Sequence, residues 1–133
     1  MSKALETMLA HRRWAVLGAT EDRARYGWKI WRMLRDFGYH AAPINPRLDE
    51  IDGERCHASI TAVDPSPQVA CFVVNPSIGL KAIEEVHEAG VRHAWLQPGA
   101  RSEQLRQRAE ALGIEVVEDC VLVQLGRRDP PAW

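Results

Sequence analysis

The chain has 133 residues, of which 26% are charged and 46% are hydrophobic, and its formal net charge is −1. This length suits one domain, residues 1–133, and the near-zero charge argues against a broad nucleic-acid or membrane surface. No apolar run approaches the roughly 20 residues of a membrane span. Because the first 13 residues also lack the apolar segment of a signal peptide, we expect a cytoplasmic protein.

Helices and strands are predicted to alternate along the chain. Charged residues alternate with apolar ones in residues 1–13, which indicates a short amphipathic helix. Short apolar runs bounded by turn residues predict buried strands, and amphipathic segments that end at glycine predict helices. In chain order these are strand 14–18, helix 28–37, strand 41–45, strand 69–74, helix 77–89, strand 93–97, helix 102–112 and strand 115–118, with a weak edge strand near 55–57.

This alternation predicts an α/β fold. Strands that alternate with helices form parallel sheets with right-handed crossovers, so we expect a doubly wound, Rossmann-like, mostly parallel sheet of five to six strands in three α/β/α layers. Ser77 and Ser102 are the predicted helix N-caps. Segment 47–67 is the least regular, and the tail 126–133 is expected to be loosely ordered.

The three cysteines predict neither a disulfide framework nor a metal site. Cys56, Cys71 and Cys120 are odd in number and too far apart for a CxxC pair. Cys71 lies in an apolar strand and is expected to be an inert core residue. Cys120 follows a strand and is either a small buried residue or a reactive thiol. The stretch HEAGVRH, 87–93, lacks a second histidine one helical turn after the first, so no zinc helix is predicted.

The turn after the first strand is the best candidate for binding phosphate. In doubly wound sheets, ligands bind beyond the carboxyl ends of the strands. Gly18 lets the backbone approach a ligand, and Ala19 and Thr20 offer N–H groups. The alternative is an ordinary turn in which Gly18 serves only to pack helix against strand. If Gly18 instead faces a ligand, Gly18→Val should block binding and leave the fold largely intact.

This turn departs from the dinucleotide fingerprint G-x-G-x-x-G, because the glycine after Gly18 is Gly27. The longer loop places basic side chains nearby that could neutralise a diphosphate, namely Arg23, Arg25 and Lys29.

The turn after the second strand favours a phosphorylated ribose. An NAD site places an acidic residue here to bind the ribose 2′-hydroxyl, whereas this chain has Asn45, Pro46 and Arg47, with no acid before Asp49. An arginine suits the 2′-phosphate of NADP or the 3′-phosphate of coenzyme A. The alternative is that Arg47 is a solvated loop charge.

The order and spacing of several stretches resemble the CoA-binding domain family, which includes small stand-alone bacterial proteins and the N-terminal domain of the succinyl-CoA synthetase α subunit. The stretches are AVLGATEDRARYGWKIWRMLRDFGY, PINP, VVNP and AWLQPGARSEQLRQRAEALGIEVVEDCVLV, and together they cover nearly the whole chain. The resemblance implies that the cofactor is coenzyme A or an acyl-CoA. It implies a diphosphate at Gly18, Ala19, Thr20, Arg25 and Tyr26, an adenosine and 3′-phosphate at Asn45 and Arg47, and pantetheine along Asn75, Pro76, Leu96, Gln97, Pro98 and Gly99, with Cys120 near the thiol end.

A binding protein without catalytic residues is the leading expectation. The synthetase uses a phosphorylated histidine on a further domain, which 133 residues do not accommodate, so its ligase activity is not expected. Two alternatives stay open. One is an NADP-binding oxidoreductase or NADP sensor, which the same loop and arginine would serve. The other is a regulatory or structural module that acts through a protein partner.

Overall fold

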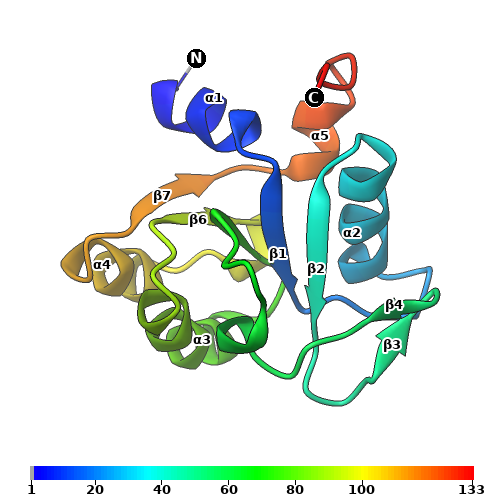
Figure 1. The fold of residues 1–133 in the computed structure, drawn as a ribbon. Helices are drawn as coiled ribbons and strands as arrows, with labels where there is room; N and C mark the ends of the chain where they lie inside the picture. Colours follow the sequence, from blue (N-terminus) through cyan, green and yellow to red (C-terminus); the bar gives the residue numbers. More distant parts are fainter. Residues whose placement is uncertain (1) are drawn as a thin grey trace.

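The central sheet has five parallel strands in the order β2-β1-β5-β6-β7 (Figure 1), in a computed structural model that describes residues 2–133. This confirms the predicted α/β class. The strands are β1 (Arg13–Leu17), β2 (His40–Ile44), β5 (Val69–Phe72), β6 (His93–Leu96) and β7 (Glu115–Glu118). Two short strands, β3 (Glu50–Ile51) and β4 (Glu54–Arg55), form a separate antiparallel pair.

Helices cover both faces of the sheet and complete the three predicted layers. Trp14, Val16 and Trp95 point to the face covered by α1, α2 and α5, whereas Ala15 and Phe72 point to the face covered by α3 and α4. This alternation along each strand follows from the two-residue period of β structure. The helices are α1 (Lys3–Ala10), α2 (Tyr26–Asp36), α3 (Pro76–Glu88), α4 (Glu103–Ala111) and α5 (Val121–Leu125), with 3₁₀ turns η1 (Ile60–Ala62) and η2 (Pro98–Ala100).

Two local predictions are wrong. Ser102 caps α4 as predicted, but Ser77 does not cap α3. Asn75 does so instead, since its side chain accepts from the N–H of Ile78. The expected edge strand near 55–57 does not join the main sheet as a strand. Glu54–Arg55 pairs with β3, and contact with the main sheet is limited to a single bridge from His57 to Ile44.

The C-terminal segment makes specific contacts with the rest of the chain, which the prediction of a loose tail did not include. Trp133 lies edge-on to Tyr39 with ring centroids 4.9 Å apart, and its indole N–H donates to the carbonyl of Phe37. Arg128 forms two hydrogen bonds with the carboxylate of Glu6 on α1. Both termini therefore lie at the same end of the molecule, beside α1 and α5 (Figure 1).

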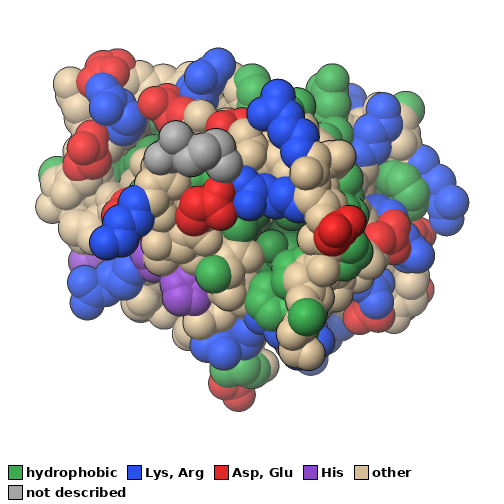
Figure 2. All heavy atoms as spheres, turned by 90° about the horizontal axis from the view of Figure 1, so that it is seen from above, with side chains coloured by type: hydrophobic (Ala, Val, Ile, Leu, Met, Phe, Trp, Pro, Cys, Tyr) green, Lys and Arg blue, Asp and Glu red, His purple; other side chains and the backbone are tan. Residues whose placement is uncertain are grey.

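Figure 2 looks onto this end of the molecule, where basic and acidic side chains are interspersed. No helix of residues 2–133 is long and apolar enough to cross a membrane.

Candidate functional site

The carboxyl ends of the strands meet at a switch point between β1 and β5. From β1 the chain moves outward to β2, whereas β5, β6 and β7 extend in the other direction. Doubly wound sheets bind ligands at such a point because the loops diverge there and leave a crevice. The turn after β1 contains Gly18, and the turn after β5 contains Val73 and Asn75, so two of the predicted binding segments lie side by side.

Gly18 packs tightly against the turn after β5. Its φ is +95°, and a Cβ at this position would overlap the carbonyl oxygen of Val73 and lie 2.9 Å from Cγ1 of Val74. The turn after β1 is also held to β2, because the N–H of Gly18 donates to the carbonyl of Ile44. A Cβ on Gly27 would in turn overlap the carbonyl of Gly18. Glycine is therefore required here for packing, and the expectation that Gly18→Val leaves the fold intact is wrong.

The start of α2 lies beside the turn after β1 and has N–H groups that no side chain caps. Side chains cap the N-termini of α1, α3 and α4, but Arg25 at the start of α2 provides no side-chain cap. Within residues 2–133, no acceptor contacts the N–H groups of Ala19 and Thr20. Uncapped helix N-termini and loop N–H groups bind anions, because they present partial positive charge. Ala19 is fully buried and Thr20 is partly exposed, so the donors within reach of a phosphate group are the N–H of Thr20 and those of the first turn of α2.

Asn45 fastens the turn after β2 to the turn after β1. Its Nδ2 donates to the carbonyl of Ala19 at 2.9 Å, and its Oδ1 accepts from the N–H of Arg47 at 2.9 Å. Its own N–H donates to the carbonyl of His57, and its carbonyl accepts from Leu48. All the polar groups of Asn45 are therefore engaged within the protein, and the residue holds the turns after β1 and β2 together.

Three basic side chains in the loops after β1 and β2 differ in their ion pairs. Arg23 lies over the ring of Trp28 and pairs with Asp52 at 3.6 Å. Arg25 is also 3.6 Å from an acid, Asp22. In the part of the chain that the structure describes, Arg47 is exposed and has no acid within 4 Å. Arg47 is thus available to a ligand without breaking an existing ion pair.

The first turns of α2 and α3 each carry an exposed apolar side chain. Tyr26 in the first turn of α2 is 64% exposed, and Ile78 in the first turn of α3 is 51% exposed. Asn75 and Pro76 begin α3, where the Asn75 side chain serves as the N-cap. Tyr26 was predicted from the sequence, whereas Ile78 was missed. Its position in the first turn after the Asn-Pro pair is the signal that could have identified it.

The turn after β6 separates into exposed and buried parts. Leu96 is fully buried, and Gln97 is 5% exposed, whereas Pro98 and Gly99 are exposed. Oε1 of Gln97 accepts from Trp95 Nε1 and from the N–H of Val121 at 2.7 Å, and its Nε2 donates to Cys120 Sγ at 3.5 Å. Gln97 therefore holds the start of α5, and only Pro98 and Gly99 of this turn are open to a ligand.

The cysteines differ in exposure as well as in position. Complete burial raises the pKa of the Cys71 thiol far above its usual range, which makes it an inert core residue as predicted. Cys120 is partly exposed at the end of β7. Residues 2–133 contain no group of three or more His, Cys, Asp or Glu side chains arranged to hold a metal ion.

The sheet order and the glycine, amide and N–H groups at its switch point define a Rossmann-like domain. The chain belongs to the CoA-binding domain family, since the family described as "CoA binding domain" matches residues 12–126.

Relatives include both large ligases and small proteins. The chain is 34% identical over 89 residues to the ADP-forming acetate–CoA ligase of Methanocaldococcus jannaschii, in a match that covers 67% of this chain but 13% of the ligase. It is 28% identical to the uncharacterized protein YneT of Bacillus subtilis, over 89% of this chain and 88% of that protein.

Solved structures agree with the fold. A Thermus thermophilus protein has a TM-score of 0.87 at 30% identity, covering 96% of this chain and 98% of its own. A conserved hypothetical protein from Pyrococcus furiosus has a TM-score of 0.80 at 37% identity, covering 85% and 98%. The dinucleotide-forming acetyl-coenzyme A synthetase 1 of Ca. Korarchaeum cryptofilum has a TM-score of 0.74 at 29% identity, over 85% of this chain and 27% of the synthetase.

Proposed function

We propose that the protein binds coenzyme A or an acyl-CoA in the crevice at the switch point and does not itself catalyse a reaction on it. The observation that carries this proposal is the uncapped N-terminus of α2 beside the N–H of the partly exposed Thr20, which no acceptor in residues 2–133 contacts. These donors form a cradle suited to a diphosphate. Family membership supports the choice of coenzyme A among the nucleotides with a diphosphate.

The proposed position of the 3′-phosphate is Arg47. Its guanidinium has no acid within 4 Å in residues 2–133, and the hydrogen bond between its N–H and Asn45 fixes its backbone next to the loop after β1. A phosphate here would form a charge-assisted contact without displacing another anion. Asn45 contributes by positioning Ala19 and Arg47, since its own polar groups are already engaged.

The proposed pantetheine path runs from the start of α3 toward η2. Asn75 and Pro76 begin this path, and the exposed side chain of Ile78 adds apolar surface beside it. Pro98 and Gly99 form its far end, where a Cβ on Gly99 would meet nothing within 4 Å. Leu96 and Gln97, which precede Pro98 in the chain, are buried and support this part of the path from within the protein. An apolar, open surface can contact the pantetheine arm. It does not provide the acid–base groups that an enzyme needs for proton transfer.

NADP is the competing ligand, because Arg47 could equally meet a 2′-phosphate. Calorimetric titration with CoA, dephospho-CoA and NADP separates the two. We expect saturable binding of CoA and weaker binding of dephospho-CoA. Saturable binding of NADP with no binding of CoA at millimolar concentration would refute the proposal in favour of the oxidoreductase or sensor alternative.

Arg47→Ala tests the position of the 3′-phosphate. Because Arg47 is exposed, its contact should lie at the low end for a charge-assisted bond, about 1.5 kcal/mol or about tenfold in Kd for CoA. The Kd for dephospho-CoA should change little. Arg127→Ala is the matched control, since Arg127 is an exposed arginine just beyond α5, next to Arg128, which bonds to Glu6 on α1. Equal losses for both ligands would show that Arg47 does not contact the 3′-phosphate.

A further inference from the structure

The edge strand β7 has main-chain groups without partners. The N–H groups of Glu115 and Asp119 point to β6, where they donate to carbonyls in or next to that strand. Because successive residues of a strand direct their main-chain groups to opposite edges, those of Val116 and Glu118 point away from the sheet. In the part of the chain that the structure describes, neither residue makes a main-chain hydrogen bond on that side. The outer side of β7 is thus a free sheet edge.

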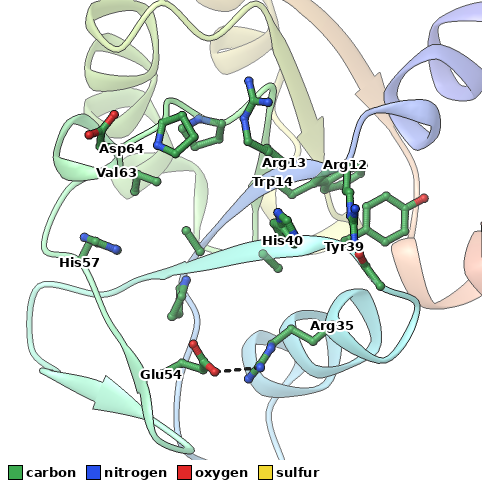
Figure 3. Close-up of a pocket in the computed structure, with 16 residues that line it drawn as sticks. Arg12, Arg13, Trp14, Arg35, Tyr39, His40, Glu54, His57, Val63 and Asp64 are labelled. Carbon is green, nitrogen blue, oxygen red and sulfur yellow. Dashed lines mark hydrogen bonds and ion pairs between the residues drawn. The ribbon is translucent and has the colours of Figure 1, made fainter. Parts of the chain in front are cut away.

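The other edge of the main sheet, formed by β2, is blocked. Pro43 has no N–H to donate, and its carbonyl already accepts from the N–H of His57. Figure 3 shows this edge with the segment of His57 beside it. The carbonyl of Ala41 accepts from the indole of Trp31. Of the two edges of the sheet, β7 is therefore the one open to a further strand.

A groove of about 460 Å³ adjoins the free edge of β7. It is lined by residues of α4, of the turn that follows α4 and of β7, which lie together at the left of Figure 1. Val116 is half-buried and packs on the side of the sheet that α3 and α4 cover, and Glu118 projects to the same side. A strand paired with these two residues would direct alternate side chains to this side, and therefore into the groove.

The groove is acidic, because one arginine serves several carboxylates. The guanidinium of Arg106 is 2.8 Å from the carboxylate of Glu103, which lies outside the groove. It is also 3.8 Å from Glu110 and 3.9 Å from Glu118, which line the groove. Glu115 is a further exposed acid of the lining, and no Lys or Arg of residues 2–133 lies within 4 Å of it. The groove beside β7 therefore has an excess of negative charge.

This charge argues against a second copy of the chain as the occupant. Pairing of two β7 strands would bring Glu115 and Glu118 of both copies to one interface, together with the acidic groove of each. Like charges on paired strands are destabilising, and acids on an edge strand oppose pairing between identical edges. The occupant that suits both the free main-chain groups and the charge is an extended segment with basic side chains.

We propose that β7 binds an extended, basic segment of a partner protein, which adds to the sheet as a further strand. The N–H and C=O groups of Val116 and Glu118 pair with the main chain of this segment, and its Lys or Arg side chains lie against Glu110 and Glu118. In strand addition the main-chain bonds provide affinity and the side-chain contacts provide specificity. The proposal does not rest on the proposed function, because β5 and β6 separate β7 from the turn after β1.

A short peptide of alternating lysine and valine, blocked at both ends and titrated into isotope-labelled protein, tests the proposal by NMR. We expect saturable shifts of the amide signals of Val116 and Glu118, and slower hydrogen exchange of these two N–H groups because they become paired. The same peptide with glutamate in place of lysine should not bind. Combining Glu110→Gln with Glu118→Gln should weaken binding about fivefold. Glu88→Gln is the matched control, since Glu88 is an exposed acid at the end of α3 outside the groove.

Glu118→Pro tests the main-chain pairing, because it removes a free N–H that makes no bond to β6, and proline is tolerated at such positions of edge strands. It should abolish the exchange protection of Val116, whereas Glu118→Gln should keep it. The proposal is overturned if the lysine peptide gives no saturable shift at about 1 mM, if both peptides bind alike, or if binding leaves the exchange of Val116 and Glu118 unchanged. Shifts of the same amides on concentrating the protein without peptide would show that a second copy occupies the edge instead.

Discussion

Gly18→Ala should destabilise the protein far more than an alanine at another glycine with positive φ. Gly18 has φ +95°, and an added Cβ would overlap the carbonyl oxygen of Val73. Gly90 provides the control, because its φ is +77° and a Cβ there would meet nothing within 4 Å. The two substitutions share the backbone penalty and the change in the entropy of the unfolded chain. Only Gly18→Ala adds a steric clash, between the new Cβ and the carbonyl oxygen of Val73.

The expected magnitudes follow from these two terms. Left-handed backbone costs an alanine about 1–2 kcal/mol, which is the whole expected effect at Gly90. Overpacking against immobile backbone adds about 1–3 kcal/mol at Gly18. Gly18→Ala should therefore lower the free energy of unfolding by about 2–5 kcal/mol. The turn after β1 has to move to relieve the clash, so we also expect CoA binding to weaken.

Urea denaturation of both variants without ligand measures this difference directly. The midpoint should fall further for Gly18→Ala at an unchanged slope m. If the two variants lose the same free energy within about 0.5 kcal/mol, the packing role of Gly18 is refuted. Glycine at position 18 would then be needed only to let a ligand approach the backbone.

Two further variants test particular contacts. Asn45→Asp removes the donor to the carbonyl of Ala19 and should lower the free energy of unfolding by about 1–3 kcal/mol and weaken CoA binding. Asn75→Asp keeps its N-cap and should leave the free energy of unfolding unchanged, so equal effects of the two variants in urea denaturation would contradict the positioning role of Asn45. Burial raises the pKa of Tyr39 to about 12, so its phenol stays protonated in the folded protein while the unfolded chain ionises near pH 10. Stability should thus be complete below pH 10 and fall as the pH rises toward 12. Tyr39→Phe should show a shallower alkaline decline in unfolding experiments between these pH values, and an identical decline would show that Tyr39 does not contribute.

The helices and strands that the sequence predicted well have strong local signals. Buried strands such as 69–74 are short apolar runs between turn residues, and their burial follows from composition alone. Ser102 was recognised as an N-cap because the next residues have helical periodicity. Asn75 was missed because Pro76 and Ser77 both resemble helix starts, and only the backbone shows that the helix begins at Pro76.

Helix α5 could not be predicted from local pattern. It has five residues, too few to display a helical period. Its first N–H is held by Oε1 of Gln97, a residue 24 positions away. The tail was also expected to be loose, yet Trp133 contacts Tyr39 and Phe37, which are distant in sequence. Such contacts depend on which strands become neighbours.

The sequence by itself determined the α/β class, the turns that would meet at one edge of the sheet and the family, because these depend on local periodicity and on the order of short motifs. Tertiary structure alone decided what the individual residues in those turns do. It engages Asn45 and Gln97 within the protein, packs Gly18 against Val73 and, among residues 2–133, leaves Arg47 with no acid within 4 Å. Each of these roles depends on partners contributed by other strands, and no local pattern encodes the position of those partners.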